Sequence, residues 1–206
     1  MLHILLLSLL LREQEQLTTI TDPAAAQRHY QQLLQLQPSD SNAHAEFAQL
    51  MAGLGRFDES LGLFKQALEL TPAWAHARST FAETLELQKR FAEAADQHAA
   101  AVMLAPQRPD LYFRLGLSLH KLWTESSVQS SGRHPQKAWQ IPRLLEAKRN
   151  LALASTVMRA GLQLSPAYVD GKNDLGVMLR EIGIRNESQA LELWQQALAL
   201  SPDHNR

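Results

Sequence analysis

The stretch Ala67–Pro72, ALELTP, decides the fold because versions of it recur along the chain. The other copies are LLQLQP at 33–38, VMLAPQ at 102–107, LQLSP at 162–166 and LALSP at 198–202. Their prolines are spaced by 34, 34, 60 and 36 residues. A fixed period of roughly 20 to 50 residues is typical of solenoids and other repeat architectures, so the spacing predicts a repeat protein.

Each unit of the repeat has the pattern of two helices joined by a turn. Large apolar residues recur every three or four positions in the second half of a unit, which predicts one buried helix face. They are Phe57, Leu61, Phe64 and Leu68 in the unit that ends at Pro72. Gly55 and Gly183 stand where a first helix should end. Each closing proline prevents the second helix from continuing.

Two further features locate the helices. Asp40 or Ser41 is expected to cap the first helix of its unit, and Asp58 is expected to cap the second. Small residues recur where the two helices of a unit should cross closely, because a bulky side chain would force the axes apart. These small residues are Ala48, Ala82, Gly116 and Gly176.

The period and these positions resemble the tetratricopeptide repeat (TPR), with Tyr112 in the tryptophan position of its pattern, followed by Leu115 and Gly116. The resemblance covers nearly the whole chain. It implies an all-α fold, a right-handed solenoid of antiparallel helix pairs that forms one domain over 1–206. Four full repeats follow a degenerate one, and the expected ranges are 1–40, 41–74, 75–108, 109–168 and 169–202.

The third repeat carries 26 extra residues near 123–150. The polar, serine-rich stretch Thr124–Gln136 predicts a surface loop, and Pro142 should mark the start of the lengthened second helix. From 124 to 150 the chain has five basic and two acidic residues. Either the insertion contacts a partner, or it is a tolerated surface insertion whose tryptophan packs back on the solenoid. The possible contacts are Arg133, Trp139 and Arg143.

Composition narrows the classes of partner and chemistry. The formal net charge is -1 and shows no basic excess, so binding to nucleic acid is not expected. The chain has no cysteine, which excludes thiolate metal sites and cysteine nucleophiles. Its eight histidines form no H-x-x-x-H pair, and His98 occupies a position that is usually a packed aromatic residue. No enzymatic activity, cofactor or metal site is therefore expected.

The prediction of the cellular compartment depends on the first eleven residues, which are mostly Leu and Ile. The apolar stretch is about half the length that a membrane-spanning helix needs, and no basic residue precedes it. We expect a cytoplasmic protein for which membrane association is not favoured. Export or membrane anchoring through residues 1–11 is the alternative.

The resemblance implies that first helices line a concave groove for a peptide or a partner helix. The residues that it places there are Asn42, Gln49, His76, Ser79, Glu83, Glu86, Phe113, Leu117, His120, Asn173 and Arg180. TPR domains that clamp carboxylate tails carry Lys, Arg and Asn where this chain has Ala45, Gln49, His76 and Thr80. The groove is instead acidic with apolar positions, which favours a partner of basic character.

The expected function is thus a non-catalytic scaffold that binds another protein or peptide. Two alternatives remain open. One is a substrate-recognition region of a larger enzyme, and the other is a spacer or assembly factor in a membrane-associated complex. The last helix has an apolar stripe that includes Leu191, Trp194 and Leu198, and its partial exposure would allow a homodimer.

Overall fold

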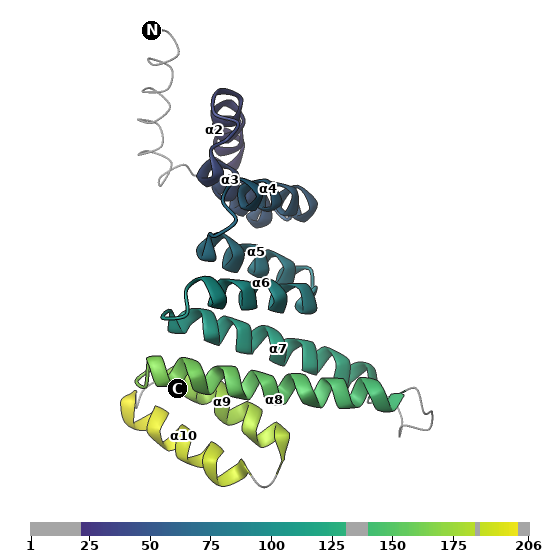
Figure 1. The fold of residues 1–206 in the computed structure, drawn as a ribbon, viewed down its shortest axis with the longest axis vertical. Coiled ribbons are helices and arrows are strands. Elements are labelled where there is room, and N and C mark those ends of the chain that lie inside the picture. Colours follow the sequence, from purple (N-terminus) through teal and green to yellow (C-terminus); the bar gives the residue numbers. More distant parts are fainter. Residues whose placement is uncertain (1–21, 131–139, 184–185, 202–206) are drawn as a thin grey trace. The chain divides into compact units, whose positions relative to one another are not determined.

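The computed structural model describes residues 22–130, 140–183 and 186–201, and side chains except those of 126–130 and 140–147. These residues are helical apart from the turns between helices, which confirms the all-α prediction (Figure 1). The helices are α2 (Pro23–Leu36), α3 (Ser41–Gly53), α4 (Phe57–Leu70), α5 (Ala75–Leu87), α6 (Phe91–Leu104), α7 (Pro109–Ser130), α8 (Gln140–Leu164), α9 (Val169–Ile182) and α10 (Glu187–Leu200).

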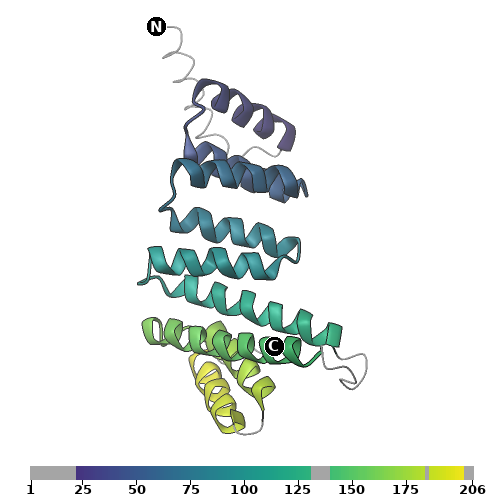
Figure 2. The ribbon, with the colours of Figure 1, turned by 45° about the vertical axis from the view of Figure 1, so that its right-hand side comes forward.

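The chain divides into two compact units, Met1–Gln88 and Lys89–Arg206. In the first unit, each described helix from α2 to α5 packs against the next one along the chain. In the second unit, the same holds for α6 to α10 (Figure 2). Neighbouring helices joined by short turns lie against each other, so each unit is built from helical hairpins.

First helices begin where the repeat period predicts them to begin. The helices α3, α5, α7 and α9 start at Ser41, Ala75, Pro109 and Val169. Asp40 caps α3 as predicted, because its carboxylate accepts hydrogen bonds from the backbone amides of Asn42 and Ala43.

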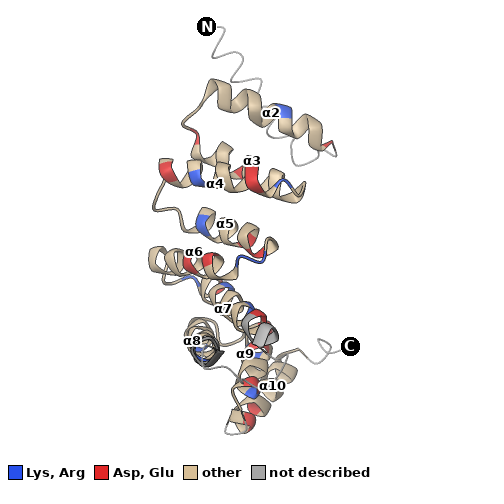
Figure 3. Cartoon of the chain, turned by 90° about the vertical axis from the view of Figure 1, so that its right-hand side faces the viewer, with Lys and Arg blue, Asp and Glu red and all other residues tan. Residues whose placement is uncertain are grey.

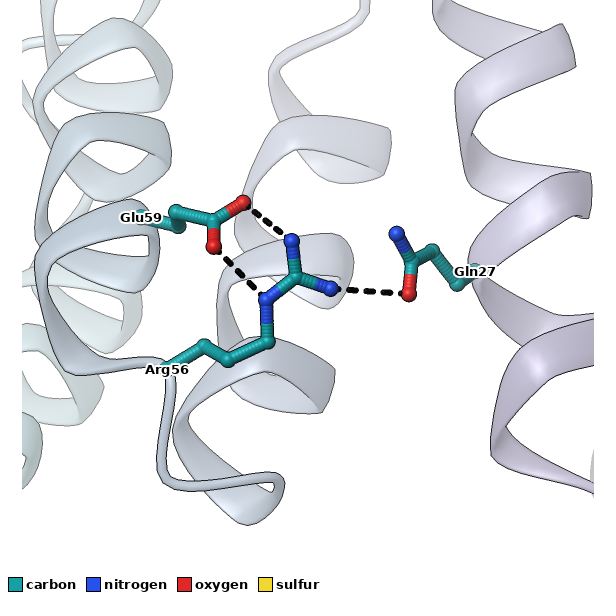
Figure 4. A network of polar contacts seen from close by, with 3 residues as sticks. All are labelled: Gln27, Arg56 and Glu59. Carbon is teal, nitrogen blue, oxygen red and sulfur yellow. Dashed lines mark hydrogen bonds and ion pairs between the residues drawn. The ribbon is translucent and has the colours of Figure 1, made fainter.

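The predicted cap of α4 is wrong. This helix begins at Phe57, so Asp58 lies in its first turn and Arg56 precedes it. Both Nε and Nη2 of Arg56 donate to the carboxylate of Glu59 at 2.6 Å, and Nη1 donates to Gln27 of α2 at 2.9 Å (Figure 4). An arginine held in this way joins the start of α4 to α2.

The predicted close crossings occur in the second unit, where each glycine faces a large side chain. A β-carbon on Gly116 would lie 2.7 Å from Cγ of Met158, and one on Gly176 would lie 2.4 Å from Nε1 of Trp194. These distances are too short for real β-carbons, so only glycine admits the neighbouring side chain. In the first unit Ala48 and Ala82 are fully buried.

Met158 and Trp194 share their repeat position with Tyr30, Phe64 and His98. Phe64 and Met158 are fully buried, and His98 is 1% exposed, as predicted for a packed residue. The second unit's core continues from this row into apolar residues of α7 to α10.

The insertion differs from its prediction. Instead of a loop from Thr124, α7 continues to Ser130, and α8 begins at Gln140, two residues before Pro142. No glycine or proline occurs between 124 and 131, so a polar helix can extend with its backbone hydrogen bonds intact. Pro142 is tolerated in the first turn of α8, where amides have no helical partner. The side chains of Arg133, Trp139 and Arg143 lie outside the described residues, as do residues 1–11.

Figure 3 shows both signs of charge distributed over several of the described helices. Among the described helices, none is long and apolar enough to cross a membrane. On α10, Leu191 is 56% exposed and Leu198 is 48% exposed, as predicted for the apolar stripe of that helix.

Candidate functional site

The first unit has a hollow of about 90 Å³ between α3 and the start of α5. Its lining combines two small apolar residues, one tryptophan and four polar side chains. The lining residues are Asn42, Ala45, Glu46, Gln49, Trp74, His76 and Ala77.

The helical period explains how α3 builds its side of the hollow. Asn42, Glu46 and Gln49 are separated by four and three residues, so they lie on one face of the helix. All three are exposed, whereas Ala45 beside them is 3% exposed. Because the side chain of Ala45 is only a methyl group, the space between the polar side chains stays unfilled and forms a shallow depression.

The start of α5 builds the opposite side. Trp74 immediately precedes this helix and is half-buried, and His76 is exposed one residue inside it. Ala77 is 1% exposed and, like Ala45, contributes a buried methyl group to the lining. The hollow is thus apolar at its base and polar at its edge.

Glu46 is oriented by the helix before it. The hydroxyl of Tyr30 donates to Oε2 of Glu46 at 3.3 Å, and the Tyr30 ring stacks on Phe47 with centroids 5.7 Å apart. Burial, and then the charge of Glu46 and this hydrogen bond, raise the pKa of Tyr30 to about 12. Tyr30 therefore remains a neutral hydrogen-bond donor to Glu46 over the physiological pH range.

The structure brings together three of the residues predicted for the groove, Asn42, Gln49 and His76. It also adds Glu46 and Trp74, which the repeat pattern does not identify. The spacing of Glu46 from Asn42 and Gln49 places it on their helix face. Trp74 falls between helices, where a pattern of first-helix positions does not reach.

None of the other groove residues predicted on α5 lines the hollow. Ser79 is 3% exposed, so its prediction as a groove residue is wrong. Ser79 lies about 200° around the helix from Ala77, so α5 is buried there on a second face as well. Glu83 and Glu86 are half-buried on the same helix and do not belong to the lining of the hollow.

Phe113, predicted as an apolar anchor for a ligand, is instead part of the core of the second unit. It is 5% exposed, and its ring centroid lies 4.3 Å from that of Tyr168. A β-carbon on Gly161 or on Gly171 would lie 3.0 Å or 2.6 Å from Cε1 of Phe113. The two glycines make room for the ring between α8 and α9. Leu117, one helical turn later, is partly buried and packs against the same core.

The remaining predicted groove residues make contacts between helices of the second unit. Nε2 of His120 lies 2.6 Å from a carboxylate oxygen of Glu181, and the backbone carbonyl of Asn173 accepts a hydrogen bond from the Trp194 indole at 3.4 Å. The guanidinium carbon of Arg180 lies 5.8 Å from the centre of the Trp194 ring. These contacts join α7 to α9 and α9 to α10.

A carboxyl group near His120 has a perturbed pKa. Burial, followed by the negative charge of Asp170, raises the pKa of Asp174 above its usual value, while His120 opposes the shift. The described residues contain no group of three or more His, Cys, Asp or Glu side chains that could hold a metal ion.

Comparisons with known proteins agree with this architecture. Residues 21–79 match the family model of the tetratricopeptide repeat. MamA from Desulfovibrio magneticus RS-1 is 17% identical with a TM-score of 0.73, and the match covers 97% of each chain. PilF of Pseudomonas aeruginosa is 19% identical with a TM-score of 0.61, over 95% of this chain and 76% of that chain. No curated protein matches the sequence.

Proposed function

We propose that the chain is a tetratricopeptide-repeat scaffold for protein–protein interaction and that it binds a peptide segment of a partner at the hollow between α3 and α5. The family match at 21–79 includes every residue of the lining. Proteins of this fold are generally non-catalytic, and the proposal assigns no reaction to the chain.

One observation carries the proposal. The carboxamides of Asn42 and Gln49 are exposed on one face of α3, and neither side chain has a hydrogen-bond partner within the described chain. A carboxamide both donates and accepts, so it matches the amide and carbonyl groups of a peptide backbone. Seven residues of helix separate the two positions by roughly 10 Å, the length of about three residues of an extended strand.

The occupant is therefore an extended segment rather than a bulky helix. Two carboxamides can hold its backbone at both ends of the hollow, while one side chain enters the depression between them. A volume of about 90 Å³ suits a single side chain. Drug-sized ligands occupy roughly 300 Å³ or more, so the hollow does not favour a small-molecule substrate.

A random peptide library selected against the full chain tests the proposal. Selected peptides should bind the Asn42→Ala/Gln49→Ala variant at least about ten-fold more weakly, since two hydrogen bonds are each worth about 1 kcal/mol. The variant Gln66→Ala/Gln195→Ala, which removes two exposed carboxamides on α4 and α10, is the matched control and should bind normally. Peptides that bind both variants equally well would place the site elsewhere.

The expected homodimer through α10 remains a prediction. Its exposed leucines, Leu191 and Leu198, are seven residues apart and so lie on one face of that helix. Light scattering over a concentration series would detect self-association, and Leu191→Lys/Leu198→Lys should abolish it if this face is the contact.

A further inference from the structure

We propose that the hollow between α3 and α5 binds the guanidinium group of an arginine side chain in the partner peptide, with Glu46 as its counter-charge. This inference rests on the proposed peptide-binding function and specifies which side chain enters the hollow. It also transfers the acidic recognition role from Glu83 and Glu86, which lie outside the lining, to Glu46.

The charge of the lining supports a cation. Glu46 is its only acidic residue, and no lysine or arginine lines the hollow. The helix α3 contains no basic residue of either kind. The one arginine of α5, Arg78, directs Nε and Nη2 to the carbonyl oxygen of Pro72 at 3.3 and 3.0 Å. The carboxylate of Glu46 thus has no cationic partner within the described chain.

The carboxylate is also held in place with one side available. Tyr30 donates to Oε2, which leaves Oε1 without a hydrogen bond within the described chain. A tyrosine that stacks on Phe47 is a rigid donor, so Glu46 loses little further side-chain freedom when it binds a ligand. Tyr30 acts here as a positioning residue for Glu46.

Hydrogen-bond geometry favours guanidinium over ammonium. Guanidinium is planar and offers five N–H donors, and it stacks on aromatic rings. The lining supplies Oε1 of Glu46 as an acceptor for a guanidinium N–H and the indole of Trp74 as an aromatic ring. A compact ammonium group is more strongly hydrated and has no planar face to stack on the indole, so it would bind this lining more weakly.

The hollow also has the right size. Its volume of about 90 Å³ accepts the end of one side chain, and its base carries the methyl groups of Ala45 and Ala77. The methylene stem of an arginine can lie against such an apolar base while its charged end reaches the polar edge.

The test uses the isotope-labelled full chain and three small probes, the N-acetyl, N-methylamide derivatives of arginine, lysine and citrulline. Citrulline has nearly the shape of arginine but no charge. The arginine probe should shift the side-chain signals of Asn42, Gln49 and Trp74 and saturate at millimolar concentration. Glu46→Gln should weaken this binding about five-fold, the upper range for an exposed ion pair. Glu69→Gln, which neutralises an exposed carboxylate on α4, is the control and should have no effect.

Each other outcome overturns a defined part of the inference. Equal binding of the citrulline probe would show that charge plays no role, and equal binding of the lysine probe would remove the guanidinium assignment. Tyr30→Phe should weaken arginine binding less than Glu46→Gln does, while melting temperatures verify that each variant is folded. If selected peptides depend on Asn42 and Gln49 but not on any arginine, this inference fails and the proposed function stands. If no peptide depends on the two carboxamides, the proposed function itself fails.

Discussion

The hydroxyl of Tyr112 donates a hydrogen bond to the carbonyl oxygen of Pro106, 3.0 Å away and six residues earlier. Arg78 makes the same contact with Pro72, and Nε2 of His44 lies 2.9 Å from the carbonyl oxygen of Pro38. Three different donors thus occupy one position of the repeat. Each reaches back to the proline that closes the preceding repeat, so the contact fixes the turn between repeats.

The fourth repeat departs from this rule. Lys172 holds the equivalent position, six residues after Pro166, but its Nζ donates to Oε1 of Gln196 at 2.6 Å. Lys172 is 9% exposed, so this contact between α9 and α10 is nearly buried. The turn before α9 therefore lacks this proline contact in the described structure.

Removing the Tyr112 hydroxyl should destabilise the fold. Tyr112→Phe keeps the ring and loses one hydrogen bond, so we expect a loss of about 1 kcal/mol in the free energy of unfolding. Tyr168→Phe is the control, because no hydrogen bond joins the Tyr168 hydroxyl to the described chain. Urea denaturation followed by circular dichroism measures both. An equal effect of the two substitutions would show that the hydrogen bond to Pro106 does not stabilise the fold.

Removing the Ser60 hydroxyl should stabilise the fold. Ser60 is fully buried, and its Oγ has no hydrogen-bond partner in the described structure. The equivalent residues of the other repeats are Ala26, Ala94, Ala154 and Ala190. Ser60→Ala should therefore raise the free energy of unfolding by about 1 kcal/mol. Ser155→Ala, which removes a hydroxyl bonded to the Ala152 carbonyl at 2.8 Å, should not stabilise. A lower melting temperature for Ser60→Ala would contradict this account.

Two glycine substitutions should have opposite signs. Gly176→Ala places a methyl group against the Trp194 indole and should cost about 1–3 kcal/mol of stability. Gly62 is exposed within α4, and a β-carbon on it would meet no atom within 4 Å. Gly62→Ala should then stabilise by roughly 0.5–1 kcal/mol through helix propensity. Thermal unfolding of the pair is decisive, since two effects of the same sign would refute the close crossing at Gly176.

Asp174 should make stability fall as pH rises. Because burial and Asp170 raise its pKa, the folded state binds the proton more tightly than the unfolded state. Its stabilising contribution is present below the unfolded pKa of 3.8 and is lost as pH rises through the higher folded value. Asp174→Asn should thus raise the melting temperature at pH 7 more than at pH 3.5. Asp96 is exposed on α6, and Asp96→Asn should leave the melting temperature unchanged at both pH values. A destabilised Asp174→Asn at pH 7 would show that the ionised carboxylate is favourable.

The sequence predicts the fold well because its signals are local and repeated. Closing prolines, Asp40 as a cap and the glycines at 116 and 176 each act within one helix pair, so a single unit contains the needed information. The extension of α7 to Ser130 is not predicted because serine-rich composition indicates a loop, whereas the actual breakers begin at Gly132.

The candidate site is harder to predict, since it depends on contacts between helices. Phe113 and Asn42 both fall on first helices, yet Phe113 becomes buried because Gly161 and Gly171, far along the chain, leave room for its ring. Glu46 gains its fixed orientation from Tyr30, 16 residues earlier. The sequence also does not predict the contact of Tyr112 with Pro106, because the position of Tyr112 holds a different residue type in each repeat.

Nuclear magnetic resonance of the side-chain amides of Asn42 and Gln49 tests the central claim most directly. When a selected peptide is titrated into the full chain, both signals should shift and saturate with the dissociation constant measured for the peptide. The signals of Gln66 and Gln195 should remain in place. A peptide that saturates the chain without moving the Asn42 and Gln49 signals would contradict binding at the hollow between α3 and α5.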